Sequence, residues 1–216
     1  MEEYQAPATL METIYLHLKK ALSKGDLKPG QRLHEKIIAE KFKVSVTPVR
    51  AALVRLTAEK YLINNARHEV LVNTHSYPET LDLYELIRVL DFYAVKKVLK
   101  DLTKDQLLCL KEMTRELGQY YRSRNFPEYM NQNLKIHNEI WKQCRNAALY
   151  ETLSTKTERL YFFRKNIDYS HFPDHASFKK SYKDHLRLIG LLEKRDLPEL
   201  ELLIQSHWGE IIFPLR

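Results

Sequence analysis

Three histidines have the residue type and the positions expected of metal ligands. His137, His185 and His207 each lie inside a separate predicted helix of one helical region, whereas the other histidines of the chain lie outside that region or flank a loop. Neutral imidazoles that converge from three helices can form an open metal site, and a side-chain oxygen can complete it. Asn133 lies one turn before His137 on the same helical face and carries such an oxygen. Helical histidines are also common as surface or hydrogen-bonded residues, so the pattern alone leaves both interpretations open.

A second group of residues fits contacts to DNA bases. The segment from Ser45 to Arg50 begins a predicted helix in which Ser45 suits the N-cap and Pro48 suits the first turn. At about 100° per residue, Thr47 and Arg50 lie on the face opposite the apolar one. A helix that presents a hydroxyl and a guanidinium near its N-terminus can enter the major groove and reach base edges. The alternative is a solvated basic face on a protein-interaction module.

The distribution of charge favours DNA. Residues 28–60 contain eight Lys or Arg against three Glu, a net charge of +5, whereas the whole chain carries +7. A basic patch on a helix-turn-helix is typical of a surface that binds duplex DNA.

Two short helices and a hairpin must hold this recognition helix. Its apolar side is expected to pack on a helix at 35–42 through Ile37, Ile38 and Phe42, and a helix at 10–24 opens the region. Residues 61–72 look like two short strands around a turn at 64–68, where asparagines interrupt a run of β-formers. The expected fold of residues 1–75 is a winged helix-turn-helix with three helices and a small hairpin.

The remaining residues, 76–216, are predicted to be entirely helical. Only 5 Gly in a chain rich in Leu, Lys and Glu favour helices. Helix starts are predicted from a capping box at Ser76–Glu79 and from capping pairs at Thr103/Gln106, Asn125/Glu128 and Asp196/Glu199. The six expected helices are about 78–100, 104–122, 127–145, 147–168, 174–195 and 197–212. An antiparallel six-helix bundle is the natural arrangement, so the fold class is mainly α.

The N-terminal region resembles the DNA-binding domain of GntR-family transcription regulators. The resemblance rests on Leu27–Leu33, on Ala39–Glu40 and on Ser45–Leu56. It departs from the family at Val46, where members usually have Arg, and at His68, where they usually have Gly. We take the DNA-contacting set that it implies, with nearby basic residues of the helix and wing, to be Lys36, Ser45, Val46, Thr47, Arg50, Arg55, Arg67 and His68.

The helical region resembles the FCD-type ligand-binding domain of the same family. The matching residues, in order, are Arg88 with Asp91, Asn133 with His137, Asp184 with His185, and His207 22 residues after His185. The resemblance implies a divalent metal, zinc or nickel, bound by Asn133, His137, His185 and His207. The family usually has Asp where this chain has Asn133. It also implies a small carboxylate effector, for which Arg88 and Tyr84 are the candidate contacts; Arg88 could equally form a salt bridge with Asp91 or Glu85.

Several other classes of protein are disfavoured. No apolar run approaches the roughly 20 residues of a membrane span, and the acidic N-terminus does not fit a signal peptide. Cys109 and Cys144 form no CxxC pair, so we expect buried thiols in a reduced cytoplasmic protein. His137-Asn138-Glu139 lacks the Pro-Cys-x-x-Cys of zinc deaminases, and the chain has no phosphate-binding loop and no nucleophile elbow.

We therefore expect a cytoplasmic, homodimeric transcription regulator, a repressor rather than an enzyme. It would bind a palindromic DNA operator, and a small organic acid would control it. A metal-dependent hydrolase-like enzyme and an architectural DNA-binding protein whose helices only dimerise are the alternatives.

Overall fold

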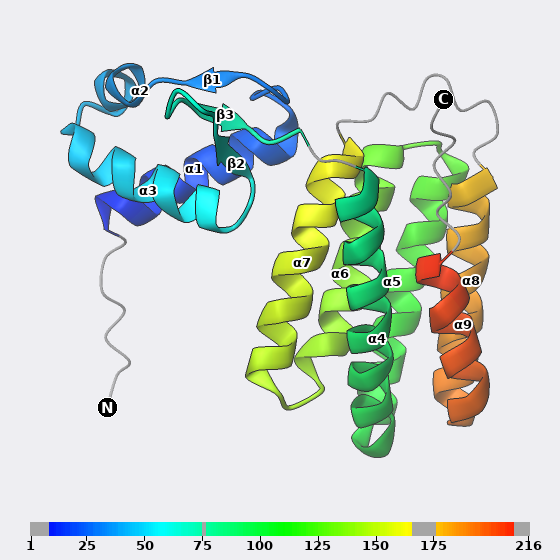
Figure 1. Ribbon diagram of the computed structural model, residues 1–216. Coiled ribbons are helices and arrows are strands. Elements are labelled where there is room, and N and C mark those ends of the chain that lie inside the picture. Colours follow the sequence, from blue (N-terminus) through cyan, green and yellow to red (C-terminus); the bar gives the residue numbers. More distant parts are fainter. Residues whose placement is uncertain (1–8, 75–76, 166–175, 210–216) are drawn as a thin grey trace. The chain divides into compact units, whose positions relative to one another are not determined.

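The computed structural model describes residues 9–74, 77–165 and 176–209 of the chain (Figure 1). Two compact units are present, one of Met1–His75 with Phe162–Ile167 and the other of Ser76–Tyr161 with Asp168–Arg216. In the described residues, the sheet belongs to the first unit and the second is helical. The mainly α fold predicted from the sequence is confirmed.

The first unit combines three helices with a three-stranded antiparallel sheet. Its elements are α1 (Leu10–Lys24), β1 (Arg32–Leu33), α2 (Glu35–Phe42), α3 (Val46–Ala58), β2 (Leu62–Asn64) and β3 (Val70–Val72). The strand order is β1-β3-β2, so the predicted hairpin of β2 and β3 is confirmed. β1 was not predicted, because a strand of two residues is too short to show an alternating pattern.

The core of this unit lies under the apolar side of α3. The four residues predicted to form that side are at most 2% exposed: Val49, Ala52, Leu53 and Leu56. Ile38 and Phe42 of α2 pack in the same core, as expected. Ile37 is 61% exposed, so the prediction that it also docks there is wrong. Successive helical residues point about 100° apart. Ile38 and Ala39 face the core, so Ile37 on the other side of Ile38 faces solvent.

Helix α1 is fixed at both ends and braces α3. The Thr9 hydroxyl accepts the backbone N–H of Glu12 at its start, and Gly25, with φ 79°, ends the helix in a left-handed conformation that glycine adopts without strain. The hydroxyl of Tyr15 donates to the carboxylate of Glu59 at the end of α3. The guanidinium of Arg55 lies 3.8 Å from the centre of the Tyr15 ring. These contacts hold the recognition helix against α1.

The second unit contains the six predicted helices, apart from the end of α7 from Phe162 on, which belongs to the first unit. They are α4 (Tyr77–Asp101), α5 (Lys104–Arg122), α6 (Phe126–Lys142), α7 (Ala147–Lys165), α8 (Ala176–Lys194) and α9 (Leu197–Gly209). α6 ends three residues before its predicted end, because Arg145 takes a left-handed φ of 52° and Asn146 caps α7 by accepting the N–H of Leu149. The predicted helical residues 166–168, 174–175 and 210–212, and the cap at Ser76, lie outside the described residues.

The predicted capping pairs explain where three of these helices begin. Thr103 and Gln106 form a reciprocal capping box at α5. The side chain of Asn125 accepts the backbone N–H of Glu128 at α6, and Asp196 accepts that of Glu199 at α9. Each side chain satisfies a backbone donor that the first helical turn leaves free.

Helix packing in this unit brings distant segments together. α4 lies against α9 and α6, α5 against α6 and α8, and α8 against α9. Cys144 is buried as expected, but Cys109 on α5 is exposed, so the prediction of two buried thiols is wrong for Cys109. Its helix has a polar face, and residue type alone does not identify which face a single cysteine occupies. The same packing places α4, α6, α8 and α9 around a pocket that three histidines and two acids help to line.

Candidate nucleic-acid interface and metal centre

α2 and α3 form the helix-turn-helix predicted from the sequence. Lys43 ends α2 with a left-handed φ of 56°, and its N–H bonds to the carbonyls of Ala39 and Glu40. Ser45 is the N-cap of α3, with extended backbone angles, but its hydroxyl makes no capping hydrogen bond in the described structure. The hydroxyl is therefore not committed to the helix end.

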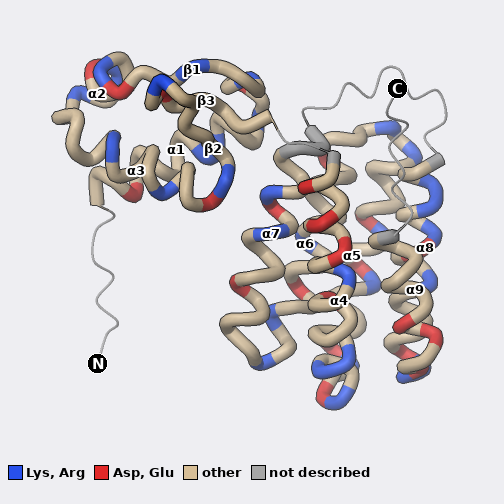
Figure 2. Tube along the Cα trace, viewed as in Figure 1, with Lys and Arg blue, Asp and Glu red and all other residues tan. Residues whose placement is uncertain are grey.

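Most of the predicted DNA-contacting side chains reach solvent. Val46 is half-buried, and the other seven are exposed: Lys36, Ser45, Thr47, Arg50, Arg55, Arg67 and His68. Figure 2 shows basic positions along α2 and α3. Arg55 differs from the rest because it pairs with Glu12 and Glu59 while packing on Tyr15. Its structural role is to tie α1 to α3.

Arg50 is oriented by an acid on the preceding helix. Its Nε donates to Glu35 Oε1 at 3.0 Å, and its second guanidinium nitrogen donates to Oε2 at 2.7 Å. The hydrogen bond from Arg50 lowers the pKa of the Glu35 carboxyl, which keeps the pair ionised. The Arg50 side chain remains 66% exposed. The guanidinium is thus held in a defined position while a large part of it stays accessible to a ligand.

The wing retains a tight turn although His68 replaces the usual glycine. His68 has φ 57°, and the Asn65 side chain accepts the backbone N–H groups of Arg67 and Glu69. A left-handed backbone explains why glycine suits this position, and histidine is among the residues that tolerate it. The substitution therefore adds a side chain to the wing without changing its turn.

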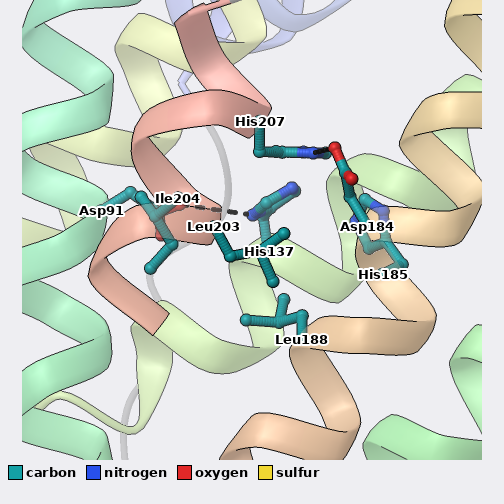
Figure 3. Close-up of a pocket in the computed structure, with 8 residues that line it drawn as sticks. All are labelled: Asp91, His137, Asp184, His185, Leu188, Leu203, Ile204 and His207. Carbon is teal, nitrogen blue, oxygen red and sulfur yellow. Dashed lines mark hydrogen bonds and ion pairs between the residues drawn. The ribbon is translucent and has the colours of Figure 1, made fainter. Parts of the chain in front are cut away.

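The three histidines of the second unit meet in one pocket. His137 comes from α6, His185 from α8 and His207 from α9, and ligand nitrogens of the three lie within 4.8 Å of one another (Figure 3). Their ring centres are 5.0 to 5.4 Å apart. The other residues that line the pocket are Asp91, Asp184, Leu188, Leu203 and Ile204. The sequence prediction that these histidines converge is consistent with this geometry.

Outer partners orient two of the rings. Nδ1 of His185 lies 2.7 Å from the carbonyl oxygen of Ser181, and Nδ1 of His207 lies 3.1 Å from Oδ2 of Asp184. A carbonyl only accepts hydrogen bonds, so His185 carries its proton on Nδ1 and has its lone pair on Nε2. Partners of this kind fix the tautomer of metal-binding histidines.

Burial keeps the imidazoles of His137 and His185 neutral. It lowers the pKa of His137 well below its usual value, and neighbouring charge on His185 and His207 adds to the effect. Burial, followed by the effect of His207, lowers the pKa of His185 to about 3. For Asp184, burial acts in the opposite direction, but hydrogen bonds from His207 and Lys180 hold its pKa below the usual value. Neutral imidazole is the form that binds metal ions.

The pocket meets the requirements of a divalent transition-metal ion. Both ring nitrogens of His137 and Nε2 of His185 are buried without a hydrogen-bond partner in the described structure. Unpartnered buried polar atoms are costly and call for a ligand or an ion. Three imidazoles suit zinc or nickel better than calcium or magnesium, which prefer oxygen. His137, His185 and His207 would hold such an ion.

Asp91 is a part of this pocket that sequence reasoning did not assign to it. Its side chain is buried, and its two oxygens accept the indole N–H groups of Trp141 and Trp208, each at 2.6 Å. Burial raises the pKa of Asp91, and the two indole hydrogen bonds oppose that effect. The family resemblance marked Asp91 and Asp184 as matching positions, but only the packing of α4 and α8 shows that both face the histidines.

The remaining predicted residues lie around the pocket rather than in its lining. Asn133 is buried on α6, and its amide donates to the hydroxyl of Tyr161 while its oxygen accepts from Ser181. Tyr84 of α4 is buried, and its ring contacts that of Trp208. Arg88, one turn further along α4, is half-buried.

The chain combines a winged helix-turn-helix, which has an exposed arginine on its recognition helix, with a helical unit in which three histidines share a pocket. This combination defines a DNA-binding regulator with a ligand domain. Two family models match this chain: bacterial regulatory proteins of the gntR family at residues 10–72, and the FCD domain at residues 82–210. The chain therefore belongs to the GntR family of transcription regulators and carries an FCD domain.

Known relatives agree with this assignment. The chain is 28% identical over 193 residues to the Nta operon transcriptional regulator of Aminobacter aminovorans, covering 88% of each protein. It is 33% identical over 141 residues to the HTH-type transcriptional regulator McbR of Escherichia coli K12, covering 63% of this chain and 62% of McbR. The solved structure of E. coli McbR/YncC has the same fold, with a TM-score of 0.76 at 23% identity, over 94% of this chain and 95% of that one.

Family membership decides between the alternatives drawn from the sequence. GntR members bind DNA and FCD domains bind small effectors, so the protein is a transcription regulator and not an enzyme. Among the described residues, no helix has the length and apolar character needed to cross a membrane.

Proposed function

We propose that the protein is a cytoplasmic homodimeric repressor that binds a palindromic operator, and that a small carboxylate bound at a zinc or nickel ion in the FCD domain controls its DNA affinity. The observation that carries the proposal is the convergence of three imidazoles from α6, α8 and α9, with unpartnered buried nitrogens on His137 and His185.

An ion in this pocket would attract an anion. It would supply positive charge and open coordination positions, because its three imidazole ligands carry no charge. Asn133, which replaces the usual Asp, adds no negative charge to that of the two acids in the pocket lining. Tyr84 and Arg88 lie one turn apart on α4, with Tyr84 against Trp208 at the edge of the site. From there Arg88 can donate a forked pair of hydrogen bonds to a carboxylate.

The size of the pocket suggests how effector binding changes the arrangement of the helical bundle. Its accessible volume is about 10 Å³, which suits a water molecule or a metal ion but not an organic acid. A carboxylate that reaches the ion must therefore move side chains or helices around it. Because the effector binds best to the opened arrangement, it shifts the bundle toward that arrangement, and the linked DNA affinity changes.

Metal analysis and a ligand screen test the proposal directly. Protein purified without a histidine tag should contain zinc or nickel near one equivalent by mass spectrometry. In a thermal-shift screen of organic acids, a stabilising acid should act on the metal-loaded protein and not after treatment with a chelator. An acid that stabilises both forms equally would contradict a metal-anchored effector and would favour Arg88 as the anchor.

Replacing Asn133 with Asp should have opposite effects on the two ligands. The added carboxylate should strengthen metal binding, because it offsets positive charge that an amide cannot offset. The same charge should weaken binding of an anionic effector. Chelator competition measures the first effect and isothermal calorimetry measures the second. If both affinities rise or both fall, the charge argument is wrong.

The helical unit is expected to supply the dimer interface. One winged helix contacts only a short half-site, so useful specificity needs two related by a dyad. Leu86, Val89 and Tyr93 are 41%, 60% and 51% exposed on α4, and their spacing places them on one face of that helix. This apolar face is our candidate for the contact.

Residues 76–216 should therefore sediment as a dimer at micromolar concentration. In the full-length protein, Val89→Glu should shift the equilibrium toward monomer by burying a charge at the contact. Leu202→Glu, at a residue 59% exposed on α9, is the matched control and should remain dimeric. A monomeric helical unit, combined with full-length protein that still binds a palindrome, would rule out this arrangement.

A further inference from the structure

Asp91 is a buried carboxylate whose hydrogen bonds come from neutral groups. It is 2% exposed, and Trp141 and Trp208 each donate an indole N–H to it. A buried charge is costly unless an opposite charge compensates for it, and two neutral donors compensate only in part. Asp91 lines the histidine pocket, where a bound cation would compensate for its charge.

Each of the three histidines has an oxygen atom facing its Nδ1, and Asp91 supplies that oxygen for His137. Nδ1 of His185 faces the Ser181 carbonyl and Nδ1 of His207 faces Asp184, so each ring has Nε2 available. Nδ1 of His137 faces Oδ2 of Asp91 at 3.9 Å (Figure 3). A closure of about 1 Å would convert this approach into a hydrogen bond. In all three rings, Nδ1–H would then donate a hydrogen bond to an oxygen outside the metal site, and Nε2 would face a common ion.

Asn133 is an uncharged amide and supplies no negative charge in this arrangement. Its amide is engaged with Tyr161 and its oxygen with Ser181, and it does not line the pocket. The buried acids that do line the pocket come from other helices, α4 and α8.

We propose that Asp91 is the compensating carboxylate of the metal centre, which holds His137 as its Nε2-binding tautomer and supplies the negative charge that Asn133 lacks. This inference rests on the metal site of the proposed function. Asp91 is thus a positioning residue that acts through His137 and through charge.

Chelator competition with Zn²⁺ tests the role of Asp91. Asp91→Asn should weaken Zn²⁺ binding about 10- to 100-fold, the usual effect of losing an outer carboxylate. Asn133→Asp in the same protein should recover part of that loss, because the carboxylate returns from α6. Asp82→Asn removes an exposed carboxylate of the same helix, α4, so it is the matched control and should bind Zn²⁺ as the wild type does.

Each result separates this inference from the metal site itself. Wild-type protein that binds no Zn²⁺ would overturn the proposed function. If the wild type binds Zn²⁺ and a folded Asp91→Asn protein binds it with the same affinity, only the role of Asp91 would be overturned. If the variant with both Asp91→Asn and Asn133→Asp binds Zn²⁺ no more tightly than Asp91→Asn alone, the charge compensation would be overturned.

A measurement on the wild type remains decisive if Asp91→Asn does not fold. Long-range ¹H–¹⁵N spectra of the histidine rings should show His137 protonated at Nδ1 and bound to Zn²⁺ through Nε2. A His137 bound through Nδ1 would overturn the inference, because that nitrogen would then be unable to donate to Asp91.

Discussion

His185→Ala and His207→Ala are each expected to abolish stoichiometric binding of zinc or nickel. His185 and His207 come from neighbouring helices and meet His137 within 4.8 Å, so one removal leaves too few ligands for a closed set. Loss of metal should also remove its stabilisation of the fold, about 2.7 kcal/mol when the ion is at 100 times its dissociation constant. This is the largest effect that we expect from a single substitution in the second unit.

The measurement must separate metal loss from cavity formation. Each variant should be melted with Zn²⁺ and with chelator, since a cavity lowers both melting temperatures and metal loss removes only the difference between them. His17→Ala, at an exposed histidine on α1, is the control and should keep that difference. Both tryptophans of the chain lie beside the pocket, with ring centres 5.0 and 5.5 Å from that of His137. Quenching of their emission by Ni²⁺ is a second readout, and variants that retain both signals would contradict the site.

Arg50→Ala is expected to cost about 1–3 kcal/mol in binding to the specific operator and much less on random DNA, with the fold intact. The side chain is exposed beside Thr47, and Glu35 binds the Nε edge of its guanidinium, which leaves the edge of the two terminal nitrogens as an oriented fork. An oriented fork suits the two acceptors of a guanine edge better than it suits a diffuse phosphate contact. Because Val46 replaces the family's usual Arg, Arg50 would carry more of the base recognition here.

Two duplexes decide this prediction: one selected from a random pool by the wild-type protein, and one scrambled. Arg50→Lys keeps the charge but loses the fork, so it should fail on the selected duplex nearly as badly as Arg50→Ala. Lys36→Ala is the comparison for a phosphate contact, expected to weaken both duplexes alike. Equal weakening by Arg50→Ala would make Arg50 a phosphate anchor, and an unchanged binding curve would exclude the docking of α3 in the groove.

Local sequence determined most of the elements of this protein. Helical periodicity identified the buried side of α3, and the caps at Thr103, Asn125 and Asp196 marked helix starts, because capping acts between residues three apart. Ordered matches to the family also indicated that His137, His185 and His207 belong together, although they are on separate helices.

Only the tertiary structure decided which neighbours these residues have. Periodicity separates an apolar face from a polar one, but it does not show that α4 lies against α6 and α9, which places Asp91 between Trp141 and Trp208. Asn133 shares a helical face with His137, yet its amide donates a hydrogen bond to Tyr161 on α7. Likewise, Glu35 reaches Arg50 across the turn between α2 and α3. These contacts join residues distant in sequence, and their geometry depends on how whole helices pack.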